Sequence, residues 1–369
     1  MIKTRNVALL ALLLSAYCRL SSAEDLWPQV VLTQPVSEDD YIGDVPKVLS
    51  VSRLSQSLAD APSAVTVIDR ETIRASGIVD LPEIFRLVPG FYVGVNAGYV
   101  QSTNYAVSYH GMTAAYSGSM QVLINGRSIY SPLYGGVQWS ELQIAIADIE
   151  LIEIPRGPNA ASYGANSFFG VINIITQNPS EVATNSIIAT YGNGRNEVFY
   201  RHADKLGDLN YRVTTGYRND EGLDNRNDSK HTRLLNAQAD YRVNEKNTVE
   251  FEFALADGTR GEGNLDKDDI LFLPRTKQID NHYALVRWRH NISDDSDFSL
   301  QAYHSYDRSD DETTSVNLRP IARAYALSKG ASVPQADGFA ASLLTDNVTI
   351  VNDVITERNA IEAQHNFAI

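Results

Sequence analysis

The side chains that could carry chemistry in this sequence are its histidines, one acidic cluster and one serine. The seven histidines are scattered, without the HExxH pattern or the helical spacing that a zinc site needs. The cluster Asp266-Lys267-Asp268-Asp269 lacks the spacing and the glycine of an EF-hand loop, so we interpret it as a solvated loop. Ser162 has no nucleophile elbow around it. These residues predict no enzyme, no metal site and no cofactor.

The first residues have the pattern of an export signal. Lys3 and Arg5 precede an apolar run at 7–16, and small residues that suit a cleavage site follow. A membrane anchor is the alternative, but the run is about half of the ~20 residues that span a bilayer. Cys18, the only cysteine, lies inside this segment. We therefore predict a signal peptide at 1–23 and a mature chain without disulfides.

The charge of the chain limits its partners. It carries 31 basic and 45 acidic residues, a net charge of −14. This charge repels nucleic acid and leaves no phosphate-binding surface. No later apolar run is long enough for a membrane-spanning helix. An exported acidic chain of this kind is either soluble in the periplasm or spans the outer membrane as β-strands.

The second half of the chain has the alternating pattern of two-faced strands. In 249–255, for example, Phe251 and Phe253 alternate with Glu250 and Glu252. Short and long polar links also alternate, as they do at the two ends of a transmembrane barrel. A soluble β-sandwich has similar strands, but the links and the export signal favour a barrel. We count about eight strands in this half of the chain, and the sequence ends within the last of them.

The preceding region mixes short strands and helices. We predict a strand at 64–68, a helix capped by Asp69 and a second short helix at 81–87. Asn125-Gly126 between two apolar stretches favours a type I′ hairpin. In the last long link we expect a short helix around 321–328.

The segment 149–176 carries the most specific motifs, IELIEIPRGP, ASYGANS and GVINIIT. They resemble the end of the plug domain of TonB-dependent outer-membrane receptors. Earlier stretches, APSAVTVI, LVPG and VLINGR, resemble parts of the same plug in the same order. His110, Leu151 and Gln177 depart from the family pattern, which has arginine, arginine and lysine there, and Pro155 is unusual. The resemblance covers about 130 residues.

This resemblance implies an α+β plug domain followed by an antiparallel transmembrane β-barrel. A plugged barrel of this class has ~22 strands, of which we count about eight, so we expect a fragment. The expected segments are a signal peptide at 1–23, a flexible leader at 24–46, the plug at 47–180 and the first part of the barrel at 181–369. Glycine permits tight turns and close approach in a crowded lumen, and the plug's charged residues could pair with the barrel's inner wall. The expected structural motif of the plug consists of Glu150, Glu153, Arg156, Gly157, Gly164, Gly170 and Asn173.

A β-prone segment before the plug, Val48, Leu49, Ser50, Val51 and Ser52, resembles the TonB box. Such a segment can add as a strand to the sheet edge of a partner. The resemblance implies that this partner is TonB with its inner-membrane energising complex. Two alternatives stay open. The segment could be the first strand of the plug, or the box could lie at 30–33.

In the resembled family, ligands bind the apex loops of the plug and the inner face of the extracellular loops. Tyrosine combines a flat apolar face with a polar tip, which suits a bulky amphipathic ligand, although it also packs protein interiors. The tyrosines expected at these apices are Tyr92, Tyr99, Tyr116, Tyr130 and Tyr134.

The function implied by the resemblance is energised uptake of a scarce, bulky nutrient across the outer membrane of a Gram-negative cell. A ferric siderophore is the first expectation, and cobalamin or another metal chelate is the alternative. A barrel enzyme or a passive porin is the alternative from another class. We expect a monomer surrounded by outer-membrane lipid.

Overall fold

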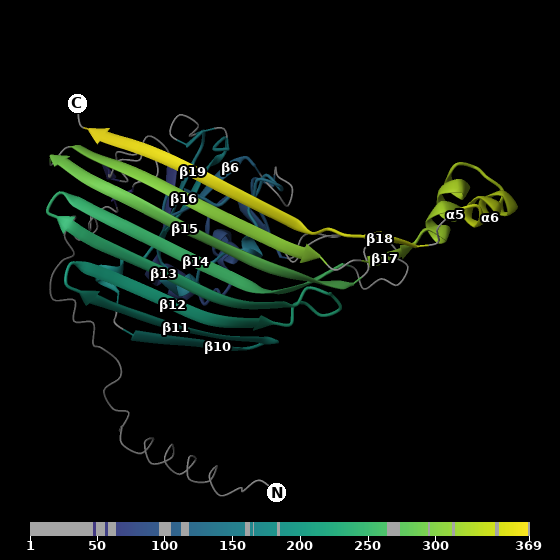
Figure 1. Cartoon of the computed structure of the whole chain (residues 1–369), viewed down its shortest axis with the longest axis horizontal. Coiled ribbons are helices and arrows are strands. Elements are labelled where there is room, and N and C mark those ends of the chain that lie inside the picture. The colour runs from purple at the N-terminus through teal and green to yellow at the C-terminus, as the bar shows by residue number, and fades with distance from the viewer. Residues whose placement is uncertain are drawn as a thin grey trace, which may run out of the picture. The chain divides into compact units, whose positions relative to one another are not determined.

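The computed structural model describes two short stretches near the N-terminus and most of the chain from residue 64 (Figure 1). The described residues all belong to one compact unit, Pro46–Ile369. The predicted signal peptide and leader lie outside the described residues. The described ranges are 47–48, 56–57, 64–95, 105–111, 118–158, 163–164, 166–182, 185–263, 274–293, 296–311, 314–343 and 347–367.

A five-stranded sheet forms the centre of residues 64–182, which we call the plug. Its strand order is β3-β8-β9-β6-β7, and only β6 and β9 run parallel. Isoleucine side chains of β8 and β9 are buried, which gives the plug its own core. The strands are β3 (Ala64–Asp69), β6 (Met120–Ile124), β7 (Arg127–Ser128), β8 (Ile149–Arg156) and β9 (Gly170–Thr176).

The predicted helix after β3 is α3 (Arg70–Ser76). Asp69 caps it by accepting a hydrogen bond from the Thr72 backbone nitrogen at 2.7 Å. The second short helix, predicted at 81–87, is confirmed as η2 (Leu81–Leu87), a 3₁₀ helix. Three single 3₁₀ turns were not predicted, because turns this short have no hydrophobic period: η3 (Trp139–Glu141), η4 (Ile146–Asp148) and η5 (Pro179–Glu181).

The predicted hairpin at Asn125-Gly126 is confirmed. Both residues have positive φ angles, 50° and 81°, and Ile124 pairs with Arg127 across the turn. A second antiparallel pair, β4 (Phe91–Gly94) with β5 (Ala106–Tyr109), flanks a loop that lies outside the described residues.

Eight antiparallel strands in consecutive order form a second sheet, which we call the wall. The plug lies against one face of it (Figure 1). Among the described residues, β10 and β19 are its two edges, so the sheet is open. Its strands are β10 (Asn185–Gly192), β11 (Arg195–Leu206), β12 (Leu209–Asp220), β13 (Lys230–Asn244), β14 (Asn247–Glu262), β15 (Arg275–Ser293), β16 (Ser296–Asp311) and β19 (Val354–Phe367).

The links of the wall follow the predicted alternation of lengths. Short links at 207–208, 245–246 and 294–295 occupy one end of the sheet, and the long links occupy the other end. One short link departs from this rule, because β10 and β11 are joined at the long-link end by Asn193-Gly194. Both residues have positive φ angles, 51° and 74°, which suits a tight hairpin.

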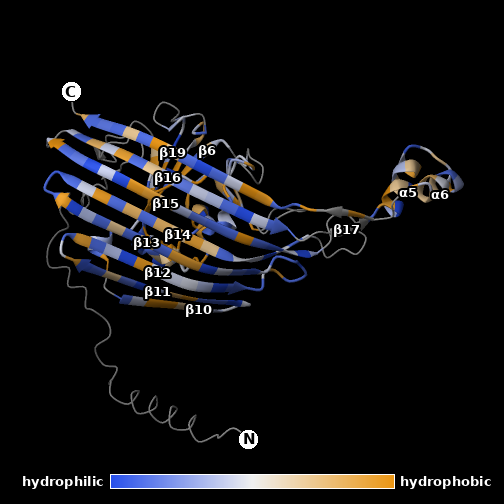
Figure 2. Ribbon diagram, viewed as in Figure 1, coloured by the Kyte–Doolittle hydropathy of each residue, from blue (hydrophilic) through white to orange (hydrophobic). Residues whose placement is uncertain are grey.

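Apolar and polar residues alternate along the strands of the wall (Figure 2), and their exposures show that its two faces differ as predicted. Phe251 and Phe253 on the outer face are 46% and 41% exposed, whereas Glu252 between them is 5% exposed beneath the plug. The outer face ends in a charged row towards the long links. Cross-strand pairing aligns Arg233 with Asp257, Asp257 with Asp280 and Asp280 with Arg308.

The link between β16 and β19 carries two helices on a two-stranded ladder of β17 (Thr314–Asn317) and β18 (Asn347–Ile350). The helix expected around 321–328 is α5 (Leu318–Ser328). The helix α6 (Val333–Ala341) was missed, because Pro334 is also typical of loops. Here Pro334 lies in the first turn of the helix, where proline is favoured. No helix in the described part of the chain is long and apolar enough to cross a membrane.

Candidate functional site

The wall holds the plug through bonds to plug backbone carbonyls and to plug side chains. Arg212 and Arg260, the largest fully buried side chains of the described residues, both donate to plug carbonyl oxygens. Their partners are the carbonyls of Gln177, at 2.9 Å, and Ser140, at 2.6 Å. Five further wall side chains donate in the same way, namely Arg195 to Val79, Arg201 to Ala147, Asn236 to Gln143, Arg287 to Asn125 and Arg358 to Ser128.

Ion pairs add to these bonds, with the acid on the plug and the cation on the wall. Arg195 contacts Asp80 at 2.7 Å, and two further pairs join Arg201 to Asp148 at 3.2 Å and Lys277 to Glu141 at 3.4 Å. Burial alone would raise the pKa of Asp80, but the hydrogen bonds and charge of Arg195 outweigh it and lower that pKa. The carboxylate of Asp80 is thus held in its charged form.

Sequence reasoning named other plug charges as partners of the wall. The structure shows Gln177 donating to Glu150 at 3.2 Å and Asn173 donating to Glu153 at 3.4 Å, both within the plug. The cationic side of the interface was missed. Its sequence signal was arginine at the polar positions of alternating strands, such as Arg212.

Of the three glycines in the predicted motif, Gly170 begins β9, and Gly157 and Gly164 lie between β8 and β9. The strand register pairs Glu153 with Asn173 and Arg156 with Gly170. Gly170 has φ 141°, and a Cβ there would clash with the Pro155 carbonyl oxygen. Glycine is therefore required at this position. Gly157 and Gly164 also have positive φ angles, 111° and 84°, with open space around them.

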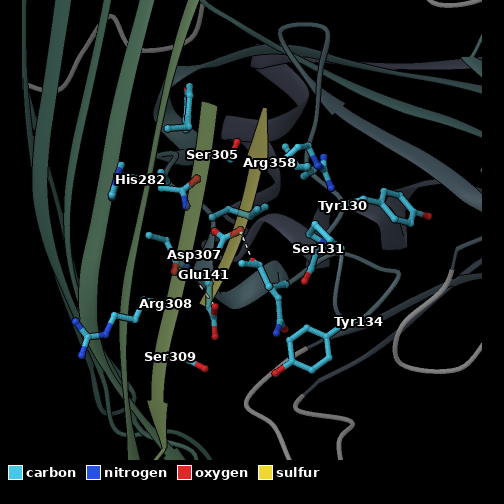
Figure 3. A pocket seen from close by; sticks show the side chains of 18 of the residues that line it. Tyr130, Ser131, Tyr134, Glu141, His282, Ser305, Asp307, Arg308, Ser309 and Arg358 are labelled. Carbon is cyan, nitrogen blue, oxygen red and sulfur yellow. Dashed lines mark hydrogen bonds between the residues drawn. The ribbon is translucent and has the colours of Figure 1, made fainter. Parts of the chain in front are cut away.

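A cavity of about 60 Å³ lies between the plug segment 127–143 and wall strands β15, β16 and β19 (Figure 3). It is near the long-link end of these strands. Two of the predicted ligand residues, Tyr130 and Tyr134, line it. Tyr92, 61% exposed on β4, does not line this cavity, and Tyr99 and Tyr116 lie outside the described residues.

The two tyrosines offer the cavity different groups. The Tyr130 hydroxyl donates to the Met120 carbonyl at 2.6 Å, so its ring is fixed in place. Burial raises the pKa of Tyr130 and of Tyr134, so both stay neutral at physiological pH. They can therefore contribute aromatic faces and hydroxyl groups, but no charge.

The cations of the cavity outnumber its available acids. Arg127 lies 3.6 Å from the centre of the Tyr283 ring and donates to Ser305, and Arg358 donates to the Ser128 carbonyl. Neither guanidinium has a carboxylate within 4.0 Å among the described residues.

Two acids and four cations line the cavity. Glu141 is bound by Lys277 and Asn281, and Asp307 accepts from Thr356. Two other lining residues contribute little to the interior, because Arg308 and His282 point away from the tyrosines in Figure 3. The arrangement therefore suits a ligand with negative charge and flat apolar groups. Among the described residues, no three His, Cys, Asp or Glu side chains are grouped to hold a metal ion.

Comparison with known proteins identifies this arrangement of plug and wall. Residues 57–171 match the model of the TonB-dependent receptor plug domain. Residues 57–171 are therefore a plug domain of the TonB-dependent receptor type. The vitamin B12 transporter BtuB of Photobacterium profundum is 33% identical over 177 residues, which are 48% of this chain and 27% of that protein. The iron-regulated outer membrane virulence protein of Vibrio cholerae is 24% identical over 247 residues, 63% and 36% of the two chains.

Solved structures of TonB-dependent receptors share the fold. The ferripyoverdine receptor of Pseudomonas aeruginosa superposes with a TM-score of 0.56 at 12% identity, covering 74% of this chain and 37% of that one. The ferric-catecholate import receptor Fiu of Escherichia coli K12 gives 0.58 at 16% identity, with coverage of 73% and 40%. This chain spans about a quarter to two fifths of the lengths of these relatives and structures.

Proposed function

We propose that this protein works as a TonB-dependent receptor of the outer membrane that imports a ferric siderophore. The observation that carries the substrate class is the cavity between plug and wall. It presents Arg127 and Arg358 without carboxylate partners, beside the rings of Tyr130 and Tyr134. An anionic metal chelate with aromatic or amide groups fits this set of contacts. The receptor binds and moves its ligand without making or breaking a bond in it.

The outer face of the wall supports a place in the membrane. Between the charged row at Arg233 and the row of Tyr241 and Trp288, the face is mostly apolar. These rows are eight residues apart, or about 27 Å along the strand. With the usual tilt, this spacing agrees with the ~25 Å apolar band of outer-membrane barrels and its flanking aromatic residues.

Cobalamin is the second candidate. The relatives with the highest printed identity are vitamin B12 transporters, at 33% and 30%. Their similarity covers only 48% and 38% of this chain, so it supports a shared plug more directly than a shared ligand. The siderophore remains our first proposal because cobalamin gives no comparable use for two guanidinium groups without carboxylate partners.

Surface binding and uptake by the full-length receptor test the two candidates. Cells that express it would be incubated with radiolabelled ferric siderophores or with cyanocobalamin, in strains with and without TonB. We expect saturable binding of an anionic ferric chelate and TonB-dependent uptake. Binding of cyanocobalamin alone would overturn the siderophore proposal.

A pair of variants connects the ligand to the cavity. Combining Arg127→Gln with Arg358→Gln should weaken binding of the chelate by at least about tenfold, the factor that corresponds to ~1.4 kcal/mol. The matched control is Arg233→Gln, an exposed arginine on the outer face, which should bind like the parent. If the parent, the double variant and Arg233→Gln bound the chelate equally, the cavity would not be the ligand site.

A further inference from the structure

Arg260 of β14 is a buried cation without an ionic partner. Its side chain is 0% exposed, and its hydrogen bonds go to the carbonyls of Ser140, His231 and Thr259 and to the Thr232 hydroxyl. No described carboxylate lies within 4.0 Å of it, and its Nε atom has no hydrogen-bond partner. A buried charge is costly unless a counter-charge compensates it.

A second small cavity, of about 20 Å³, adjoins this side chain. A space of roughly 10–15 Å³ is enough for one water molecule, so the cavity has room for a single water or a monatomic ion. Tyr105 and Trp139 of the plug form part of its boundary, and the wall contributes Arg218, Lys230 and Arg260. The cavity thus lies on the interface that keeps the plug in the wall.

The charges around this cavity favour a negative occupant. Asp80 is the one acid among the residues lining it, and Arg195 already binds that carboxylate at 2.7 and 3.1 Å. Of the three cations, Arg218 is paired with Glu197. Lys230 reaches its nearest acid, Asp220, only at 4.0 Å, and its ammonium lies 5.0 Å from the Tyr105 ring centre.

We propose that this cavity binds one small monovalent anion, of the class of chloride or bromide, against Arg260 and Lys230. The anion supplies the missing counter-charge between plug and wall. A water molecule would fill the space but bring no negative charge into contact with Arg260 and Lys230. The site is separate from the larger cavity, and it does not depend on which nutrient the receptor imports.

Crystals of the full-length receptor grown in sodium bromide test the proposal directly. We expect an anomalous peak at the bromine absorption edge between Arg260 and Lys230. In crystals of Arg260→Met the peak should be lost, and in those of Arg212→Met it should remain. Arg212 is an equally buried wall arginine that does not line the cavity, so it controls for the loss of one plug contact. A parent crystal without a bromine peak in this cavity overturns the proposal.

Thermal unfolding of the purified receptor gives a second measurement. Bromide is compared with gluconate, which is too large for the cavity, at the same ionic strength. A ligand that binds only the folded state raises Tm. We expect bromide to raise Tm in the parent and in Arg212→Met, but not in Arg260→Met. The same bromide-dependent shift in all three proteins would contradict the site.

Discussion

Arg195 of β11 holds the carboxylate of Asp80 through two guanidinium contacts, at 2.7 and 3.1 Å. Asp80 directly precedes η2 in the plug, whereas Arg195 begins a wall strand, so the pair joins residues 115 positions apart. Glu197 and Asp220 also contact Arg195. Through Arg195, Asp80 of the plug thus joins an ionic network with Glu197 and Asp220 of the wall.

Loss of this carboxylate should loosen the plug without unfolding the wall. Asp80→Asn leaves Arg195 with its two wall partners, so we expect a cost of about 1–3 kcal/mol, the range for a lost charged hydrogen bond. Limited proteolysis of the full-length receptor should cut the plug faster, while the wall stays intact. Glu83→Gln, which removes a more exposed ion pair with Arg86 in the same segment, is the control and should be cut like the parent. Equal cleavage of both variants would contradict this role of Asp80.

The same pair sets a pH dependence. The pKa of Asp80 is lowered from 3.8 in the folded protein, so its carboxylate favours folding above that value. This stabilisation is constant at higher pH and is lost as pH falls below 3.8 towards the folded-state pKa. The difference in Tm between parent and Asp80→Asn should therefore be unchanged from neutral pH to about pH 5 and shrink only in stronger acid. If the difference in Tm already disappeared near pH 6, the stabilisation would come from a titratable group other than Asp80.

The outer face of β14 offers a test of the membrane assignment. Phe251→Arg places a charge in the apolar band and should cost ~2–4 kcal/mol near the midplane, so little folded barrel should reach the outer membrane. Thr259→Arg is the matched control, since Thr259 lies on the same face of the strand but beyond the charged row. The measurement is the heat-modifiable, folded fraction in outer-membrane preparations. Similar folded fractions for the two variants would argue against a lipid-facing strand.

Coupling to TonB is tested in the segment from Val48 to Ser52. Only Val48 lies within the described residues, in β1 (Lys47–Val48), which pairs with β2 (Gln56–Ser57). Leu49→Pro removes a backbone donor and bends the strand, so strand addition to TonB should fail. Ligand binding at the cell surface should stay normal while energised uptake is lost.

Two outcomes would decide against this box. Normal uptake by Leu49→Pro excludes the segment, and Val31→Pro then tests the rival at 30–33. Reduced surface binding by Leu49→Pro would instead make the segment part of the plug's fold.

Gly170 gives a prediction about the plug alone. Gly170→Ala forces a Cβ against the Pro155 carbonyl oxygen at a φ of 141°, so β8 and β9 must separate. We expect a loss of more than ~1 kcal/mol, beyond the cost of a positive φ angle by itself. Gly164→Ala, with a positive φ but open space around its Cβ, is the control. Equal losses for the two variants, measured as changes in Tm of the receptor, would show that the close approach at Gly170 is unimportant.

Features encoded by neighbouring residues could be predicted from the sequence. The turn at Asn125-Gly126 depends on two adjacent residues, and the faces of β14 depend on a period of two, so both were found. The contacts between plug and wall depend on pairs such as Ser128 and Arg358, which are 230 residues apart. No local pattern specifies which wall arginine meets which plug carbonyl. For the same reason Tyr92 was grouped with Tyr130 and Tyr134, although it does not line their cavity.

The use of backbone carbonyls as anchors has a consequence for how such receptors evolve. A carbonyl oxygen is present whatever side chain a position carries, so substitutions at Ser128, Ser140 or Gln143 keep the acceptors of Arg358, Arg260 and Asn236. The plug segment 127–143 also lines the larger cavity. Its side chains can therefore change with a new nutrient while these backbone bonds to the wall are kept. Selection for a different ligand acts on the side chains of these residues, whereas selection for a bound plug acts on their backbone carbonyls.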